Sequence, residues 1–244
     1  LEDLQGRRGG GCGMKFVTVS GPPSVGKTAV VIKTLEHLMR KGQRVGVVKL
    51  DCLATDDDKI YQQSGILVRK GLSGALCPDH FFVSNVEEVV QWGLAAELDL
   101  LVSESAGLCN RCSPHIKGVL AVCVVDNLSG VHTPKKIGPM LKSADIVVVT
   151  KGDVVSQAER EVFARSVSLV SPKALVLSVN GITGQGSAEL CSLLDQAAPL
   201  TTVKGAKLRF SMPAALCSYC LGETRIGESF QQGNVRKINL EGTT

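Results

Sequence analysis

Short aliphatic runs alternate with longer amphipathic segments through most of the 244-residue chain. Such runs are typical of buried strands, whereas apolar positions three and four residues apart are typical of helices that cover a sheet. The pattern predicts strands at residues 14–20, 44–50, 100–103, 119–125, 146–149 and 174–178. It predicts helices at residues 27–41, 84–98, 156–167 and 187–197, the second and third of which begin at Ser-x-x-Glu capping boxes, and it leaves residues 53–82 as short helices and loops. We therefore expect an α/β fold with a mostly parallel sheet and helices on both faces.

The pattern also divides the chain into three segments. Residues 1–13 are rich in glycine and are expected to form a flexible leader or to be additional residues before a natural start at Met14. Residues 14–200 carry the alternating pattern and are expected to form one domain. Residues 201–244 are polar and turn-rich, and they form a predicted C-terminal extension with the pair Cys217-x-x-Cys220.

Composition narrows the class of protein. A net charge of +4 and only 4% aromatic residues give no basic, aromatic-rich surface, so we expect no nucleic-acid partner. The apolar runs are too short for a membrane span and no secretory signal is visible, which predicts a cytoplasmic protein without a membrane partner. Nine cysteines in a reducing compartment indicate metal or redox chemistry more than structural disulfides.

A phosphate-binding loop follows the first predicted strand. The segment Gly21-Pro-Pro-Ser-Val-Gly26-Lys27-Thr28 fits G-x-x-x-x-G-K-[ST] and lies between a strand and an amphipathic helix, which is the context that the motif requires. Its backbone N–H groups and the helix N-terminus would cradle phosphates, Lys27 would neutralise them, and the Thr28 hydroxyl would bind Mg²⁺. The residues expected to bind the nucleotide here are Gly21, Pro22, Pro23, Ser24, Val25, Gly26, Lys27, Thr28 and Ala29. This P-loop places the predicted α/β fold among the P-loop NTPases.

Two later segments indicate guanine as the base. Thr150-Lys-Gly-Asp153 follows a predicted strand and resembles the [NT]-K-x-D motif, in which the carboxylate of Asp153 would accept hydrogen bonds from guanine and the stem of Lys151 would cover the ring. Downstream, Ser178, Val179 and Asn180 begin a loop that resembles the second guanine-contact segment. GTP and GDP are therefore the expected nucleotides.

Further motifs give the chain a resemblance to the nickel-chaperone GTPases of the UreG/HypB type. The motifs are Glu104-Ser-Ala-Gly107 after an aliphatic strand, Val125-Asp-Asn-Leu-Ser-Gly130, Thr133-Pro-Lys-Lys-Ile-Gly-Pro139 and the base motif. The resemblance implies that Glu104 and Asp51 belong, with Lys27 and Thr28, to the Mg²⁺ and hydrolysis site. It also implies a nucleotide-dependent homodimer, and a client metalloenzyme or another maturation protein as partner. Because no arginine finger is evident, we expect slow GTP hydrolysis.

Three cysteine groups are candidate metal ligands. Cys77-Pro-Asp-His80 lies where the urease-type chaperones have Cys-Pro-His, and Cys77 and His80 are suitable ligands for Ni²⁺ or Zn²⁺. The remaining candidates form a C-x-x-C-x-x-H cluster and a C-x-x-C pair: Cys109, Cys112, His115, Cys217 and Cys220. The four thiolates of the two pairs would satisfy a tetrahedral Zn²⁺ or an iron–sulfur cluster.

Three functions fit these motifs. The leading hypothesis is a GTP-binding and GTP-hydrolysing metallochaperone that delivers or gates a transition metal for a metalloenzyme. One alternative is an iron–sulfur P-loop NTPase that drives reductive activation of, or electron transfer to, a partner. Another is a regulatory GTPase with a structural zinc, whose metal content would not depend on the nucleotide.

Overall fold

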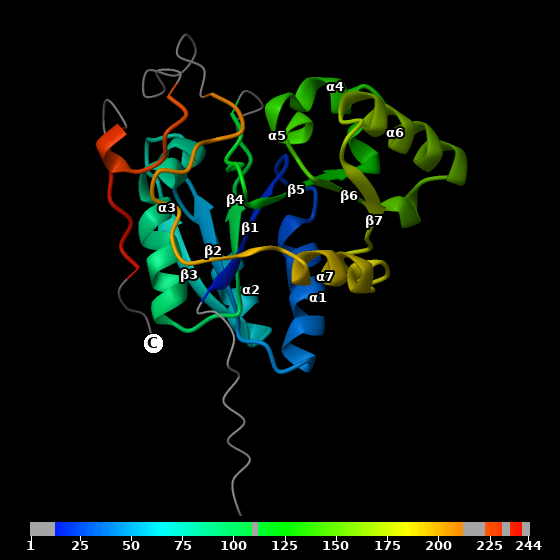
Figure 1. Cartoon of the computed structure of the whole chain (residues 1–244). Coiled ribbons are helices and arrows are strands. Elements are labelled where there is room, and N and C mark those ends of the chain that lie inside the picture. Colours follow the sequence, from blue (N-terminus) through cyan, green and yellow to red (C-terminus); the bar gives the residue numbers. More distant parts are fainter. Residues whose placement is uncertain (1–12, 109–111, 212–222, 231–234, 241–244) are drawn as a thin grey trace, which may run out of the picture.

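The protein is an α/β structure built on one twisted sheet, and its computed structural model describes residues 13–108, 112–211, 223–230 and 235–240 (Figure 1). The strands are β1 (Met14–Ser20), β2 (Val45–Asp51), β3 (Leu67–Leu72), β4 (Leu100–Ser105), β5 (Leu120–Asp126), β6 (Ile146–Thr150), β7 (Leu175–Ser178) and β8 (Pro199–Leu200). Their order is β3-β2-β4-β1-β5-β6-β7, all parallel, while β8 pairs antiparallel with β1. The predicted fold class, a mostly parallel sheet with flanking helices, is confirmed.

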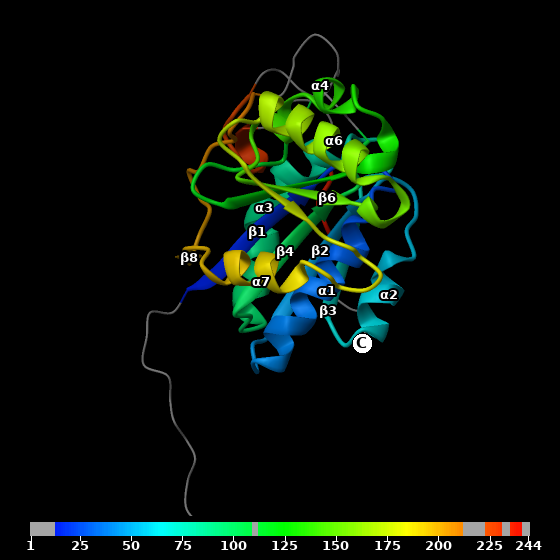
Figure 2. The same cartoon turned by 90° about the vertical axis from the view of Figure 1, so that its right-hand side faces the viewer.

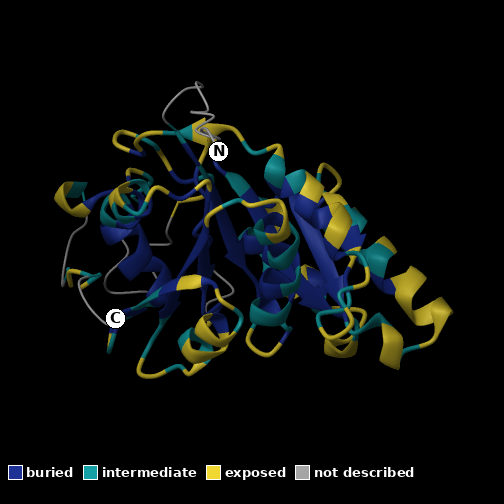
Figure 3. Ribbon diagram, turned by 90° about the horizontal axis from the view of Figure 1, so that it is seen from below, coloured by how far each residue is buried: buried dark blue, intermediate teal, exposed yellow. Residues whose placement is uncertain are grey.

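Helices cover both faces of the sheet (Figure 2). They are α1 (Lys27–Arg40), α2 (Asp57–Gln63), α3 (Pro78–Ala95), α4 (Thr133–Ile137), α5 (Pro139–Lys142), α6 (Gln157–Val170) and α7 (Ser187–Asp195). One face packs against α1, α2 and α7, and the other against α3 on one side and α4 to α6 on the other. The central strands β1, β2, β4, β5 and β6 lie buried between these layers, as Figure 3 shows in dark blue. None of the described helices is long and apolar enough to cross a membrane.

The order of the strands creates the crevice in which ligands of such sheets bind. Strand β1 lies between β4 and β5: the chain runs from β1 to β2 and β3 on one side of it, returns to β4, and then crosses β1 to reach β5 on the other side. Ligands bind at this kind of switch point, outside the carboxyl ends of the strands. The loop that follows β1 and precedes α1 therefore lies where the sheet is open to a ligand.

Two local predictions are wrong. Residues 53–82 were expected to contain no strand, but they contain β3. It is an edge strand in which the polar Arg69 and Lys70 interrupt the apolar pattern. Helix α3 begins at Pro78 and not at Ser84, which is buried inside the helix and donates its hydroxyl to the carbonyl of His80 at 2.9 Å. By contrast, the capping box predicted at Ser156 is present.

The described part of the C-terminal extension returns along the sheet and α3. Arg209 donates to both carboxylate oxygens of Asp145, at 2.6 and 2.7 Å, and the amide of Ile238 donates to Asn85 of α3 at 2.9 Å. These contacts tie the extension to the sheet domain. The division at residue 200 stays a prediction. Residues 1–12 of the predicted leader lie outside the described residues.

Candidate functional site

A cavity of about 770 Å³ lies over the P-loop at the carboxyl ends of the strands. It is lined by most of the predicted nucleotide-binding loop and by acidic residues from β2, α2 and β4. Lys27 is 5% exposed and donates its ammonium to the carbonyls of Gly21 and Pro22, at 2.9 and 2.8 Å. Burial lowers the pKa of Lys27 to about 8, against a smaller opposing effect of Glu104. The cavity thus offers a buried lysine and a helix N-terminus to an anion.

Oxygen ligands meet at the first turn of α1. The Thr28 hydroxyl lies 2.9 Å from Oε1 of Glu104 and 3.2 Å from Oδ2 of Asp57. Asp51 lines the same cavity, and its carboxylate accepts the amide of Cys52 at 2.8 Å. Asp57, the first residue of α2, was not among the sequence candidates, because the region before β3 showed no clear element. The structure thus brings together Thr28 and Glu104, as predicted, and adds Asp57.

Glycine permits a close approach between the P-loop and the segment after β4. Gly107 has φ +73°, and a Cβ atom there would lie 1.7 Å from the carbonyl oxygen of Gly21. This contact requires a residue without a side chain. The end of β4 and the P-loop are therefore packed directly against each other.

The two predicted guanine segments face a second cavity, of about 340 Å³. Asp153, Ser178, Val179 and Asn180 line it, together with Arg160 and Gln185, which the sequence did not single out. Lys151 donates its ammonium to the carbonyl of Ser24 and to Asp126, both at 2.8 Å, and Thr150 donates its hydroxyl to the carbonyl of Val25 at 2.6 Å. The predicted base site is thereby joined to the P-loop.

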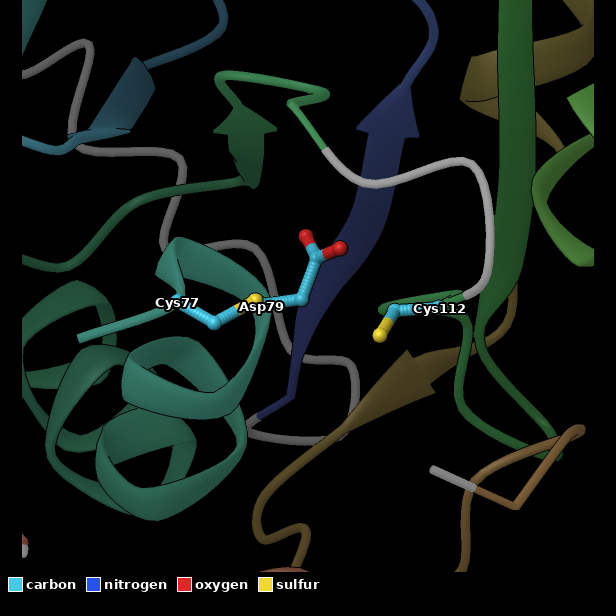
Figure 4. Close-up of side chains that lie close together, drawn as sticks. All are labelled: Cys77, Asp79 and Cys112. Atoms are coloured by element: carbon cyan, nitrogen blue, oxygen red, sulfur yellow. The ribbon is translucent and has the colours of Figure 1, made fainter. Parts of the chain in front are cut away.

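A group of metal-ligand side chains lies at the start of α3. Cys77, Asp79 and Cys112 have ligand atoms within 4.8 Å of one another, and Figure 4 shows them extending toward one another from the beginning of α3 and from the loop after β4. Ser105, at the end of β4, donates its hydroxyl to Asp79 at 2.7 Å. Thiolate sulfur and carboxylate oxygen are ligands that Zn²⁺ accepts.

The histidines do not join this group. His115 is fully buried, with Nδ1 2.8 Å from the Thr18 hydroxyl and Nε2 3.0 Å from the Ser20 hydroxyl. Burial, and next the charge of Arg209, lower its pKa to about 3. Both ring nitrogens are engaged with strand β1, so His115 does not join the cysteine group, and a metal-binding role for it stays a prediction. His80 is buried on α3, and Asp79 takes the place expected for it beside Cys77.

Three of the predicted ligands cannot be placed, because Cys109, Cys217 and Cys220 lie outside the described residues. Whether the two C-x-x-C pairs form one site stays a prediction.

Comparisons with known proteins identify related nucleotide-binding proteins. The family model described as CobW/HypB/UreG, nucleotide-binding domain, matches residues 15–178. An uncharacterised protein of Methanocaldococcus jannaschii is 46% identical over 226 residues, which cover 93% of this chain and 97% of that protein. Urease accessory protein UreG 2 of Methylorubrum populi is 28% identical over 202 residues, 74% of this chain and 92% of that protein.

Solved structures share the fold. The crystal structure of HypB from Helicobacter pylori in complex with nickel aligns with a TM-score of 0.61 at 17% identity, covering 75% of this chain and 86% of that one. At this identity the likeness concerns the arrangement of the sheet and helices.

Proposed function

This chain belongs to the CobW/HypB/UreG family of nucleotide-binding proteins, and from that premise we propose that it binds and hydrolyses GTP and uses the nucleotide cycle to hold or release a transition metal for the maturation of a metalloenzyme. The observation that carries the proposal is the end of β4. Glu104 lies beside the P-loop Thr28, and the next residue, Ser105, is bonded to Asp79 of the cysteine group. One strand end thus joins the nucleotide cavity to the candidate metal ligands.

Guanine is the proposed base because its donors match the side chains of the second cavity. Asp153 offers a carboxylate to the N1–H and amino groups of guanine, and adenine presents no such pair of donors. Asn180 uses its side-chain oxygen to accept the amides of Ile182 and Thr183, at 2.8 and 3.0 Å, which holds the second segment in a tight turn. The base would lie between this turn and Lys151.

The hard oxygen donors at the first turn of α1 fit Mg²⁺. Carboxylate oxygens of Glu104 and Asp57 lie within 3.2 Å of the Thr28 hydroxyl. Oxygen atoms are the ligands that Mg²⁺ prefers. A bound Mg²⁺ would supply charge neutralisation for the phosphates. Lys27 would donate to the β- and γ-phosphate oxygens in place of its present carbonyl partners, and the loop N–H groups would orient them. Asp51, on the same cavity, is the proposed group that orients the attacking water.

The cysteine group suits a metal that is to be passed on. Cys77, Asp79 and Cys112 supply three ligands from one chain, so a tetrahedral ion would keep one position for an exchanging ligand. Soft thiolates with a carboxylate suit Zn²⁺ or Ni²⁺ better than Mg²⁺. Movement of Glu104 with the nucleotide would shift Ser105 and release or hold Asp79. The metal would then bind differently in the two nucleotide states.

A second copy of the chain is the proposed partner at the nucleotide face, in addition to a client protein. The apolar side chains of Leu53, Ile60 and Leu108 are 79%, 45% and 56% exposed, and the last two line the nucleotide cavity. Covering them in a dimer would remove apolar surface from water. The mass in solution, measured by light scattering with GDP and with a non-hydrolysable GTP analogue, tests this point: dimer formation should depend on the analogue.

The central test is a metal titration in the two nucleotide states. Ni²⁺ and Zn²⁺ affinities are measured against a chromogenic chelator, with GDP and with a non-hydrolysable GTP analogue, and we expect them to differ by about tenfold, the scale of ordinary coupling. Cys112→Ser should lose most of the affinity. Cys191→Ala, which alters a thiol in the core between α1 and α7, should keep it.

The outcomes separate the three hypotheses. Ser105→Ala should keep nucleotide and metal binding but remove the difference between the GDP and GTP-analogue states. Equal metal affinity in both states of the wild type would refute gating and favour a structural zinc. Iron with broad visible absorbance in anaerobically purified protein would favour the iron–sulfur alternative.

A further inference from the structure

A buried lysine lies among the carboxylates of the nucleotide cavity. The side chain of Lys49 is 4% exposed, and its ammonium lies 2.6 Å from Oε1 of Glu104 and 2.6 Å from Oδ2 of Asp57. It lines the cavity with both of these residues. Neither the motifs nor the family assignment accounts for this residue. A cation buried in this way requires paired carboxylates, because an unpaired charge would be costly to bury.

Strand register explains how Lys49 reaches Glu104. In the parallel pair β2–β4, Lys49 stands opposite Glu104, so the two side chains leave the sheet side by side toward α1 and α2. On the other side of β2, Lys70 of β3 stands opposite Lys49 and pairs with Asp58 at 2.7 Å. Two neighbouring lysines thus hold the two aspartates that begin α2. These ion pairs connect the start of α2 to β2 and β3.

Lys49 changes the charge of the candidate Mg²⁺ site. Glu104 and Asp57 carry two negative charges, and the ammonium between them reduces the sum to one. Thr28 adds a neutral hydroxyl. A divalent ion that approaches the two carboxylates is repelled by the ammonium at close range, where charges interact strongly. The phosphates of a nucleotide would supply the missing negative charge and further oxygen ligands.

We propose that Lys49 is a positioning residue that makes Mg²⁺ binding depend on the nucleotide: its ammonium keeps Glu104 and Asp57 in place beside Thr28 and prevents the two carboxylates from holding a divalent cation by themselves. The metal then enters as part of a metal–nucleotide complex. This inference rests on the proposed nucleotide function of the same cavity. It assigns to Lys49 both the placement of α2 and the order in which ligands bind.

The test is a titration with Mn²⁺, a spectroscopic substitute for Mg²⁺, in the absence of nucleotide. Free Mn²⁺ is measured by electron paramagnetic resonance, and competition with Mg²⁺ assigns the binding to oxygen ligands, since thiolates do not hold Mg²⁺. The wild type should bind Mn²⁺ weakly. Lys49→Met, which keeps the length and removes the charge, should bind it about tenfold more tightly or better, because one positive charge is removed from contact distance.

Three further variants complete the design. Lys49→Gln is also neutral but keeps an N–H donor for one carboxylate, so it tests the proposal if Lys49→Met does not fold. Lys49→Arg keeps the charge and should bind Mn²⁺ as weakly as the wild type. Tyr61→Phe removes another hydrogen bond to Glu104 without changing the charge, and it should also leave Mn²⁺ binding weak.

Two results would overturn the proposal, and the first is a folded neutral variant at Lys49 that binds Mn²⁺ no more tightly than the wild type. Equal increases in Mn²⁺ affinity in Lys49→Met and Tyr61→Phe would also overturn it. They would show that the affinity rises when any hydrogen bond to Glu104 is lost, and not because a charge is removed. The titration contains no nucleotide, so its outcome does not depend on guanine selectivity or on hydrolysis. Failure of the proposed function would appear separately, as absent GTP binding by the wild type.

Discussion

Substituting Gly107 with alanine should damage the P-loop although Gly107 lies outside that loop. Gly107 has φ +73°, where alanine costs about 1 kcal/mol or somewhat more. The added Cβ would lie 1.7 Å from the carbonyl oxygen of Gly21, so that carbonyl would have to move. It has little room, because Gly21 is itself packed against the carbonyl of Val124, 2.1 Å from the position of a Cβ on Gly21. Relief of such overpacking costs about 1–3 kcal/mol more, so we expect a total loss of about 2–4 kcal/mol.

Nucleotide binding should fall with stability, because the displaced Gly21 carbonyl also accepts the ammonium of Lys27 at 2.9 Å. Urea unfolding followed by circular dichroism measures the stability, and titration with a fluorescent GTP analogue measures nucleotide binding. Gly118→Ala is the matched control: Gly118 has φ +79°, and a Cβ there would meet nothing within 4 Å. It should lose only the backbone cost, about 1 kcal/mol, and bind nucleotide normally.

The difference between the two variants measures the contact itself. If Gly107→Ala and Gly118→Ala lost equal stability and both bound the analogue as the wild type does, the packing of the β4 end against Gly21 would not shape the phosphate site. The assumed rigidity of the P-loop would then be wrong.

Three further predictions concern other parts of the structure. Asp153→Asn should weaken GTP binding about tenfold or more and admit xanthosine triphosphate, measured by competition; unchanged guanine selectivity would refute the assigned base site. The folded-state pKa of His115, about 3, lies below the ordinary histidine pKa of about 6.5, so the unfolded chain takes up the proton first and stability present above pH 6.5 is lost as the pH falls toward 3. Urea titrations should show this loss at up to about 1.4 kcal/mol per pH unit in the wild type but not in His115→Gln. Arg209→Met should cost about 2–3 kcal/mol of unfolding free energy, because it leaves three carbonyl groups and part of Asp145 without their donor, and Arg209→Lys should recover little of it.

The phosphate side of the site could be predicted because its signals are local. Strand β1 is a largely apolar segment that begins and ends where expected, and the spacing of the P-loop motif dictates a turn followed by a helix. The elements between β2 and α3 could not be predicted in the same way. Strand β3 lies at the edge of the sheet and forms backbone hydrogen bonds with β2 alone. Its charged side chains interrupt the apolar pattern from which a strand is predicted. Without β3, the short helices expected within residues 53–82 had no defined position, so Asp57 at the start of α2 was not recognised.

The candidate metal group shows how a small error in an element boundary hides a site. Cys77 and Cys112 were both candidates, but in separate groups, and Asp79 was treated as an insertion. A helix start at Ser84 leaves residues 77–80 in a loop, whereas the true start at Pro78 fixes Cys77 and Asp79 at the same helix end. The loop after β4 then brings Cys112 to them, because β4 ends beside α3. Only the fold connects the two cysteines.

Lys49 marks the limit of pattern reasoning more sharply. A lysine within an aliphatic strand interrupts the run by a single residue, which leaves the strand recognisable and the lysine apparently incidental. Its burial nevertheless requires carboxylates nearby, since a buried ammonium without them would lose several kcal/mol of solvation. Which carboxylates these are depends on the order of the strands. Because β2 pairs with β4, which is not its neighbour in sequence, the partner is Glu104, and an isolated charge in the sequence becomes part of the nucleotide site.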